Sequence, residues 1–391
     1  MNFHWQRKRC LVLLGIVAIS LTAFLILTRP VYAQTKTDAE KSKAIHHALA
    51  EIVADDKAPG MIAAIISSEG IIAIGSAGVR KVGSTVAITC NDLVHLGSCT
   101  KAMTGTMLAT LVAEGKLNWE MKLIEAIPEL KKTIHPDYHS ITLWQLLTHR
   151  AGLPANPVDW EAHHTKEIKE RRLAILKDNL SSPPATKRGE FNYSNFGYMV
   201  AACMAERITG SPWESLMRQR LFEPLGMMSA GFGEPDKRKS IDQPWGHDRF
   251  SGKWQPSTAY DAEALGPAGE IHCTIEDWAK VISLQFAGKN PILDRTYLNR
   301  LIEPEGFYAG GWGVSERPWA KGIVLLHNGS NGIWFATVMV APKIDRAFVV
   351  VTNSRDFFST SETCGKMMAK LIMINNELWG NKNHENKKKK S

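Results

Sequence analysis

A serine and a lysine three positions apart are the first residues of this sequence whose spacing suits chemistry. Ser98 follows Gly97, and an apolar helical pattern covers residues 99–114, so the serine is predicted to lie at a helix start. Side chains three apart project from nearly the same face, which lets the hydroxyl of Ser98 meet the amine of Lys101. A partly desolvated lysine has a lowered pKa and can take the proton of a nucleophilic serine. A helix cap is the alternative role for this serine.

Two later stretches offer partners for this pair. Tyr193 precedes an apolar helical pattern at 196–209, and Asn195 follows it two positions on. The phenol can accept a proton and the amide can hold a substrate, although a packed aromatic with an asparagine cap is the alternative. His327 ends an apolar strand pattern, and Gly329 after it would let a substrate approach the backbone closely.

The elements that must position these residues follow from the periodicity of the apolar residues. A helix is expected over 37–54 and a β-hairpin over 61–74. Helices are then expected over 99–114, 142–149, 161–179, 196–209, 213–222 and 274–286. Residues 229–270 read as a long irregular region. Three strands and a closing helix follow, over 323–327, 334–340, 347–352 and 362–378.

Strands therefore lie near both ends of the chain, and helices fill the middle. The predicted fold class is α+β, an α/β sandwich with one mainly antiparallel sheet from the N-terminal hairpin and the C-terminal strands, flanked by helices. This α/β part takes residues 37–80 and 270–380, with a helical lobe inserted at 81–269. The catalytic domain is thus expected to span 34–380, and residues 381–391 a basic disordered tail.

The net charge of +8 comes from the two ends of the chain. Residues 1–33 carry four basic residues and no acid, and the tail from position 381 carries another +4. The middle of the chain is therefore close to neutral. A nucleic-acid partner is not expected, because no basic surface remains to hold a phosphate backbone.

The first 33 residues predict an export signal. Residues 1–9 are basic, residues 10–27 are apolar, and small or branched residues precede position 34. Attachment to the inner membrane through residues 10–27 is the alternative. In both cases the body of the protein is expected outside the cytoplasm, either periplasmic or secreted. The five cysteines that follow have scattered spacings, which indicate neither a disulfide framework nor a zinc site, and no cofactor is predicted.

The three elements stand in one order: Ser-x-x-Lys at 98–101, Tyr-Ser-Asn at 193–195 and His-x-Gly at 327–329. This order resembles the signature of the serine β-lactamase and penicillin-binding-protein superfamily. The tyrosine form of the middle motif looks like the class C β-lactamase branch, with its esterases and D-amino-acid peptidases. Family landmarks are also resembled by residues 146–154, 191–210, 221–227 and 266–270. The resemblance covers roughly residues 40–375 and implies a β-lactamase/transpeptidase-like fold.

The resemblance also implies a role for each matched residue. Ser98 matches the nucleophile that becomes acylated, and Lys101 matches its proton-handling partner. Tyr193 matches the residue that acts with the lysine as general base and activates water for deacylation. Asn195 matches the amide that orients the substrate and the lysine. The backbone N–H groups of Ser98 and Ser330 would form the oxyanion hole, because such donors stabilise charge on a carbonyl oxygen.

One position departs from the pattern of the family's β-lactamases, which usually carry lysine where this chain has His327. A lysine is a permanent cation that can hold a substrate carboxylate, whereas a histidine is mostly neutral at pH 7. His-x-Gly is frequent among members that resemble esterases or peptidases. We therefore expect His327 and Gly329 to bind substrate and expect penicillin-type substrates to be disfavoured. Four tryptophans are weaker candidates for an aromatic substrate wall, with core packing as their alternative: Trp245, Trp254, Trp312 and Trp334.

The function expected from the sequence is an exported serine hydrolase. It would form an acyl-enzyme at Ser98 on a small ester, amide or D-amino-acid peptide. Two alternatives remain: a class C-like β-lactamase that hydrolyses β-lactams, and a catalytically silent protein that binds cell-wall peptide on the same scaffold.

Overall fold

The computed structural model describes residues 36–236, 240–258, 262–288, 290–356 and 359–388. The predicted export segment at 1–33 and the last three residues of the predicted tail lie outside the described residues. Within the described ranges, no helix has both the length and the apolar character needed to cross a bilayer.

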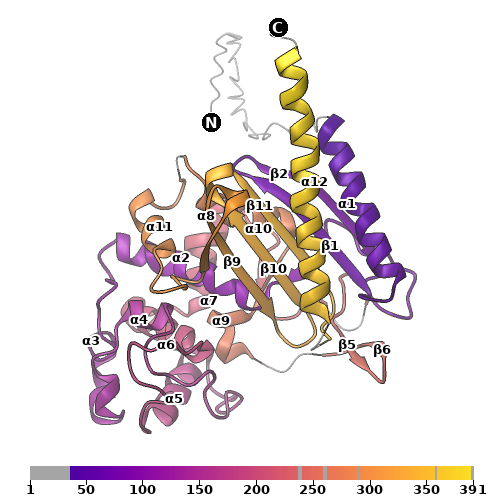
Figure 1. The fold of residues 1–391 in the computed structure, drawn as a ribbon. Helices are drawn as coiled ribbons and strands as arrows, with labels where there is room; N and C mark the ends of the chain where they lie inside the picture. The colour runs from indigo at the N-terminus through magenta and orange to yellow at the C-terminus, as the bar shows by residue number, and fades with distance from the viewer. Residues whose placement is uncertain (1–35, 237–239, 259–261, 289, 357–358, 389–391) are drawn as a thin grey trace, which may run out of the picture. The chain divides into compact units, whose positions relative to one another are not determined.

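A six-stranded antiparallel sheet of order β2-β1-β11-β10-β9-β8 organises the chain (Figure 1). Its strands are β1 (Gly60–Ser67), β2 (Gly70–Gly78), β8 (Gly313–Arg317), β9 (Gly322–Ser330), β10 (Phe335–Ala341) and β11 (Arg346–Thr352). The N-terminal hairpin joins the C-terminal strands through β1 and β11, where Met61 lies opposite Thr352. The predicted sheet from both ends of the chain is confirmed. β8 was not predicted because this edge strand has only one buried apolar residue, Val314.

Alternate residues of β1 face two different cores. Met61, Ala63 and Ile65 pack in one core with α1 (Lys36–Ala54) and α12 (Thr360–Lys388), two helices that lie side by side over the sheet in Figure 1. The residues between them face the other way, into a core shared with the helical middle of the chain. The apolar run of β1 is nearly continuous because successive side chains alternate between two buried faces.

The helices of the middle of the chain mostly follow the predicted pattern. They are α2 (Thr100–Ala113), α3 (Leu123–Ala126), α4 (Leu143–Leu147), α5 (Ile168–Leu180), α6 (Asn195–Thr209), α7 (Trp213–Met217), α8 (Glu223–Leu225), α9 (Gly266–Gly269), α10 (Ile275–Ile282) and α11 (Arg295–Ile302). Thr142 caps α4 and Thr274 caps α10 by accepting from the backbone three residues on. Gly210 ends α6 in the left-handed conformation.

Several helix boundaries differ from the prediction: α7 and α10 end early, at Met217 and Ile282, and two further differences have a clear cause. α5 begins at residue 168 rather than 161, because His163 adopts a φ of 59° that a helix cannot contain. α12 continues to Lys388 and so takes in most of the stretch expected to be a disordered tail. Residues 381–388 contain neither glycine nor proline, the residues that most strongly end a helix.

The region predicted to be irregular, 229–270, contains short strands. β4 (Gly231–Phe232) and β3 (Val94–His95) pair with opposite sides of β7 (Ile271–Cys273). β5 (His247–Phe250) and β6 (Lys253–Pro256) form a separate hairpin. The pairing of β3 with β7 has a direct consequence for the site, because it sets residues 266–270 against the turn that carries Ser98.

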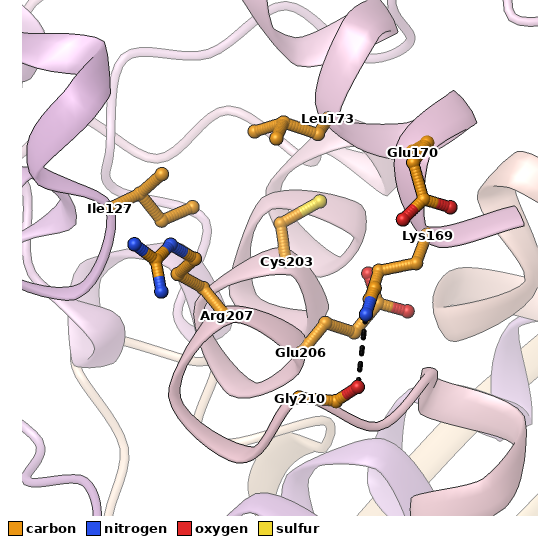
Figure 2. Close-up of a pocket in the computed structure, with 8 residues that line it drawn as sticks. All are labelled: Ile127, Lys169, Glu170, Leu173, Cys203, Glu206, Arg207 and Gly210. Carbon is orange, nitrogen blue, oxygen red and sulfur yellow. Dashed lines mark hydrogen bonds between the residues drawn. The ribbon is translucent and has the colours of Figure 1, made fainter.

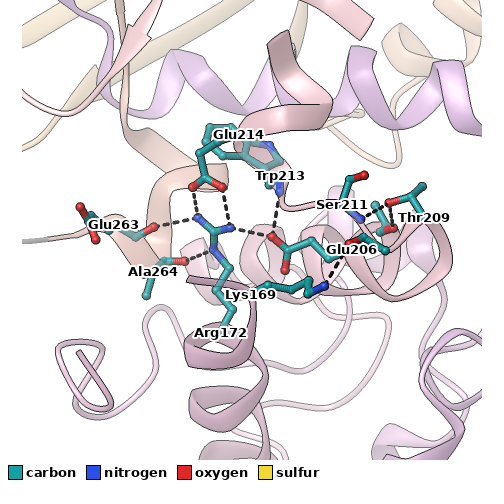
Figure 3. A network of polar contacts seen from close by, with 11 residues as sticks. Lys169, Arg172, Glu206, Thr209, Ser211, Trp213, Glu214, Glu263 and Ala264 are labelled. Atoms are coloured by element: carbon teal, nitrogen blue, oxygen red, sulfur yellow. Dashed lines mark hydrogen bonds and ion pairs between the residues drawn. The ribbon is translucent and has the colours of Figure 1, made fainter. Parts of the chain in front are cut away.

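A buried arginine ties the helices to that same segment (Figure 3). The Arg172 side chain of α5 is fully buried and donates to Glu206 of α6 at 2.7 Å and to Glu214 of α7 at 2.5 Å. It also donates to the backbone carbonyls of Glu263 and Ala264 at 2.9 and 3.1 Å. A buried charge needs such partners to offset its loss of water. The network therefore holds three helices and the approach to α9 in one arrangement.

Candidate active site

Ser98 lies on a 3₁₀ turn, residues 97–99, that leads directly into α2. Gly97 has a φ of 50°, and a Cβ at this residue would lie 2.2 Å from the backbone nitrogen of Ser330. A Cβ at Gly329 would lie 2.7 Å from the backbone nitrogen of Ser98. Gly329 was expected to make room for a substrate. In the structure that space holds the turn of Ser98 itself, because the turn packs against the edge of β9.

The Lys101 side chain, one turn further along, is fully buried. Its Nζ lies 3.0 Å from Ser98 Oγ, 2.7 Å from Asn195 Oδ1 and 2.8 Å from the carbonyl oxygen of Ala268. Burial lowers the pKa of Lys101 well below its usual range. The predicted approach of the two side chains from one helix face is confirmed, and the environment favours an uncharged amine.

The Tyr193 hydroxyl forms a hydrogen bond with Ser98, and the tyrosine ring lies 4.8 Å from Lys101 Nζ. Burial raises the pKa of Tyr193 above its usual range, against the opposing effect of the Ser98 hydrogen bond. The phenol is therefore protonated at neutral pH. Ser98 thus lies beside an amine that can accept a proton and a phenol that can donate one.

A histidine supports Tyr193 from behind. The His149 ring lies 4.3 Å from the Tyr193 ring, centroid to centroid, and its Nδ1 accepts a hydrogen bond from the backbone N–H of Ser194 at 3.0 Å. Burial, assisted by the nearby Lys101, lowers the pKa of His149 to about 2. An uncharged imidazole thus fixes the backbone next to the tyrosine. Sequence reasoning placed this residue in a family landmark but gave it no role.

Asn195 begins α6 and links Lys101 to a second asparagine. Its Oδ1 accepts from the lysine, and its Nδ2 donates to Asn156 Oδ1 at 2.8 Å. Ser194 caps the helix by accepting from the backbone N–H of Gly197 at 2.9 Å. The cap fixes where the helix starts and therefore where the Asn195 amide points.

The backbone N–H groups of Ser98 and Ser330 come from two facing segments. β8 pairs with β9 only as far as Leu326, opposite Gly313, so residues 327–330 present a strand edge to the turn at 97–99. Both serines line the same cavity. A carbonyl oxygen placed there would meet the backbone donors expected of an oxyanion hole.

His327 does not line that cavity. Its Nε2 accepts from the Tyr308 hydroxyl at 2.9 Å, and its Nδ1 donates to the carbonyl oxygen of Asn328 at 2.7 Å. Burial, assisted by Lys101, lowers the pKa of His327 to about 3. His327 was expected to bind substrate. In the structure it is an uncharged residue of β9, and both of its ring nitrogens are hydrogen-bonded within the protein.

The cavity at Ser98 has a volume of about 180 Å³. Its lining residues are Ser98, Asn156, Trp160, Asn195, Ala262, Leu265, Ala268, Gly269, Glu270, Ser330 and Asn331. None of the four tryptophans proposed as a substrate wall is among these described residues, whereas Trp160 is. The sequence around Trp160 carries no periodic pattern, so no local signal identified it.

A second cavity, of about 170 Å³, lies between α5 and α6 (Figure 2). It is lined by Ile127, Lys169, Glu170, Leu173, Cys203, Glu206, Arg207 and Gly210. Figure 2 shows the amine of Lys169 donating to the carbonyl oxygen of Gly210, a hydrogen bond of 2.9 Å. This cavity shares no residue with the first and contains no predicted nucleophile, so the cavity at Ser98 is the candidate active site.

Comparison with known proteins places the chain in a family. The model of the family described as Beta-lactamase matches residues 45–363, and the chain belongs to this family. Solved structures share the fold, including a D-amino acid amidase from Ochrobactrum anthropi SV3 and a class C β-lactamase from Rhodobacter sphaeroides. The amidase has 21% sequence identity and a TM-score of 0.70, over 88% of this chain and 99% of the amidase. The β-lactamase has 17% identity and a TM-score of 0.68, over 85% of this chain and 100% of the β-lactamase. The fold is therefore β-lactamase/transpeptidase-like, as predicted.

Two curated relatives extend the comparison. An unguisins hydrolase from Aspergillus campestris is 26% identical over an alignment of 327 positions that covers 78% of this chain and 59% of the relative. Penicillin-binding protein 4 from Amycolatopsis lactamdurans is 23% identical over 75% of this chain and 81% of its own length. The chain thus spans about three fifths of the first relative and about four fifths of the second.

Proposed function

We propose that this protein is an exported serine hydrolase that forms an acyl-enzyme at Ser98 on a small ester, amide or D-amino-acid peptide. One observation carries the hydrolase proposal: the buried amine of Lys101 lies 3.0 Å from Ser98 Oγ. An uncharged amine has two N–H donors and one lone pair. Asn195 Oδ1 and the Ala268 carbonyl oxygen accept the two donors, which leaves the lone pair for the hydroxyl of Ser98.

The proposed reaction follows from these positions. As Ser98 Oγ attacks the substrate carbonyl carbon, its proton passes to the uncharged amine of Lys101, and the carbonyl oxygen becomes an oxyanion at the N–H groups of Ser98 and Ser330. The bond to the leaving group breaks, and the leaving group takes up the transferred proton. A water molecule then loses a proton to the amine of Lys101, with the Tyr193 phenol able to relay it, and attacks the acyl carbon. The bond to Ser98 breaks, the acid is released and the proton returns to Ser98 Oγ.

The state of His327 supports esters or amides over β-lactams among the candidate substrates. A substrate carboxylate needs a cation beside the cavity, and His327 is uncharged at neutral pH and bonded to Tyr308. A class C-like β-lactamase is therefore the second candidate, favoured only by the fold and the family. The third candidate, a silent binding protein, fits poorly with an amine and a phenol both in contact with a partly exposed serine.

The proposal of export rests on residues 1–33 alone. They combine a basic start with an apolar run. Sequencing the N-terminus of the protein recovered from cell fractions tests it. A start near residue 34 in the periplasm or medium supports export with cleavage, an intact leader in the membrane fraction supports anchoring, and recovery from the cytosol contradicts both.

Intact mass spectrometry of the purified protein tests the hydrolase proposal. A small fluorophosphonate should add one adduct to the protein and to the Cys99→Ala variant, and none to Ser98→Ala. Turnover of p-nitrophenyl butyrate and nitrocefin by the same preparations then separates an esterase from a β-lactamase. A folded protein that takes no adduct and hydrolyses neither compound would establish the silent alternative.

A further inference from the structure

The cavity at Ser98 carries a single charged side chain among its described lining residues, the carboxylate of Glu270. The other lining groups are amides, hydroxyls, small residues and apolar side chains. Glu270 ends the segment 266–270, and its neighbour Gly269 lies against the turn of Ser98, where a Cβ would be 3.9 Å from the Ser98 nitrogen. An acidic side chain therefore stands in a small cavity, close to where the reacting carbonyl must sit.

Two histidines among the described residues lie near Glu270, His95 and His272. Burial lowers the pKa of His272, so His95 is the one to consider as a partner for the carboxylate. His95 Nε2 is fully buried, makes no hydrogen bond and lies 3.8 Å from Glu270 Oε2. Its Nδ1 accepts from the backbone N–H of Gly97 at 3.2 Å, which only an unprotonated Nδ1 can do. Burial lowers the pKa of His95, and Glu270 and Glu234 together raise it overall. Protonation of His95 at Nδ1 would break the contact with Gly97, so the ring faces Glu270 as an uncharged Nε2–H group.

A second carboxyl group stands behind the cavity wall. Glu234 accepts from Asn331 Nδ2 at 2.5 Å and from Trp334 Nε1 at 3.2 Å, and Asn331 itself lines the cavity. Burial raises the pKa of Glu234 above its usual range, and Glu234 does not line the cavity, so the charge of this wall rests on Glu270. The wall is suited to attract a cation and to repel an anion.

We propose that Glu270 binds an ammonium group of the substrate. The substrate class is then an ester or amide of an amino acid with a free amino group, and acyl groups that carry a carboxylate are excluded. Because Gly269, the neighbour of Glu270, lies against the Ser98 turn, the cation that we propose is an α-amino group, a few bonds from the scissile carbonyl. This inference rests on the proposed hydrolase function, and Glu270 acts in it as a specificity residue.

Three p-nitroanilides test this inference at pH 7, where an α-amino group is mostly charged. D-Alanine p-nitroanilide carries the cation, its N-acetyl derivative is neutral, and its N-succinyl derivative is anionic. The purified wild-type protein should prefer the amine over the N-acetyl compound by at least about tenfold in kcat/KM and should discriminate most against the succinyl compound. Glu270→Gln should bring the ratio of amine to N-acetyl compound close to one, and Glu270→Asp should retain part of it.

Glu276→Gln is the matched control, because Glu276 is an exposed carboxylate on α10, and its removal should change neither the rates nor the ratio. Protection of Ser98 from the fluorophosphonate by D-alaninamide, but not by its N-acetyl form, gives the same comparison without turnover. The inference is overturned if the wild-type ratio of kcat/KM for the amine over the N-acetyl compound is near one, or if Glu270→Gln keeps the wild-type ratio. In either case, Ser98-dependent hydrolysis of p-nitrophenyl butyrate would still support the hydrolase proposal. Failure of labelling and of all turnover overturns both.

Discussion

At the scale of single residues, the unusual feature is a fully buried lysine amine in contact with a serine hydroxyl. Burial penalises the ammonium form, because an ion loses far more solvation than a neutral group does. The three acceptor or hydroxyl contacts of Lys101 suit the uncharged amine and supply no carboxylate to hold a charge. The same burial that lowers the pKa of Lys101 therefore makes it a base at a pH where an ordinary lysine is not.

This state predicts the pH dependence of acylation. Lys101 is inactive as a base when protonated. The rate of fluorophosphonate labelling should therefore rise with pH in a single step, centred well below pH 10.5, the ordinary pKa of lysine, and then level off. His149 and His327, with pKa values of about 2 and about 3, stay uncharged from pH 5 to 8 and contribute no step there. Lys101→Arg, which remains charged throughout, should lower the plateau rate by at least about 100-fold and remove the step. A rise of the labelling rate centred near pH 10.5, or an unchanged pH dependence of that rate in Lys101→Arg, would contradict this account.

Sequence reasoning identified the site residues that stand in recognisable motifs and missed the role of those outside them. The spacing of Ser98 and Lys101 follows from helix geometry, so it was predictable. Glu270 stood in the landmark segment 266–270 but was given no role, and Trp160 lies in no motif and reaches the cavity only through packing. His327 was predicted as a substrate contact, but the direction of its ring depends on Tyr308, a residue without any motif.

At the scale of elements, the site depends on a helical turn packed against the edge of a strand without intervening side chains. Gly97 and Gly329 provide this close approach. Sequence reasoning located both elements, but it could not show which faces of them meet, because that depends on the register of β9 with β10 and β8. β8 and α11 escaped prediction altogether. An edge strand and a short charged helix bury too few apolar residues to leave a clear period.

The packing predicts the effect of one methyl group. In Gly329→Ala the new Cβ would lie 2.0 Å from the carbonyl oxygen of Leu96 and 2.7 Å from the nitrogen of Ser98, so the turn must move. Displacement of a nucleophile by about 1 Å is expected to lower kcat/KM on p-nitrophenyl butyrate by about 100-fold. Gly365→Ala is the control, since its Cβ enters open space on α12 and should keep full activity with a slightly raised Tm. Wild-type kinetics in Gly329→Ala would show that the turn tolerates the movement.

At the scale of the whole molecule, the cavity is assembled from the α2 turn, the start of α6, the α9 segment and the end of β9. The sheet and the two cores packed on it hold the end of β9 in place. The Arg172 network holds the residues that lead into α9. The overall architecture was predictable because apolar strands and helices leave strong periodic patterns. A buried arginine leaves none, and its partners come from separate helices.

A ligand that joins these parts should stabilise the whole chain. A small boronic acid that forms a reversible bond to Ser98 Oγ should raise Tm with the logarithm of its concentration, by about 2.7 kcal/mol of unfolding free energy at a hundred times its Kd. Differential scanning fluorimetry measures this shift, and Ser98→Ala should show none. An equal shift in Ser98→Ala would mean that the compound binds elsewhere.

The position of Ser330 on a strand that pairs with β10, and through it with β11 and β1, bears on how the protein is made. Ser98, Lys101 and Tyr193 leave the ribosome well before the strand that carries Ser330 and would complete the proposed oxyanion hole, and β10 and β11, which pair beside that strand, are translated later still. A polypeptide interrupted after the tyrosine would carry every reactive side chain and remain inert. Catalysis is thus withheld until the last strands of the sheet have been translated and have docked.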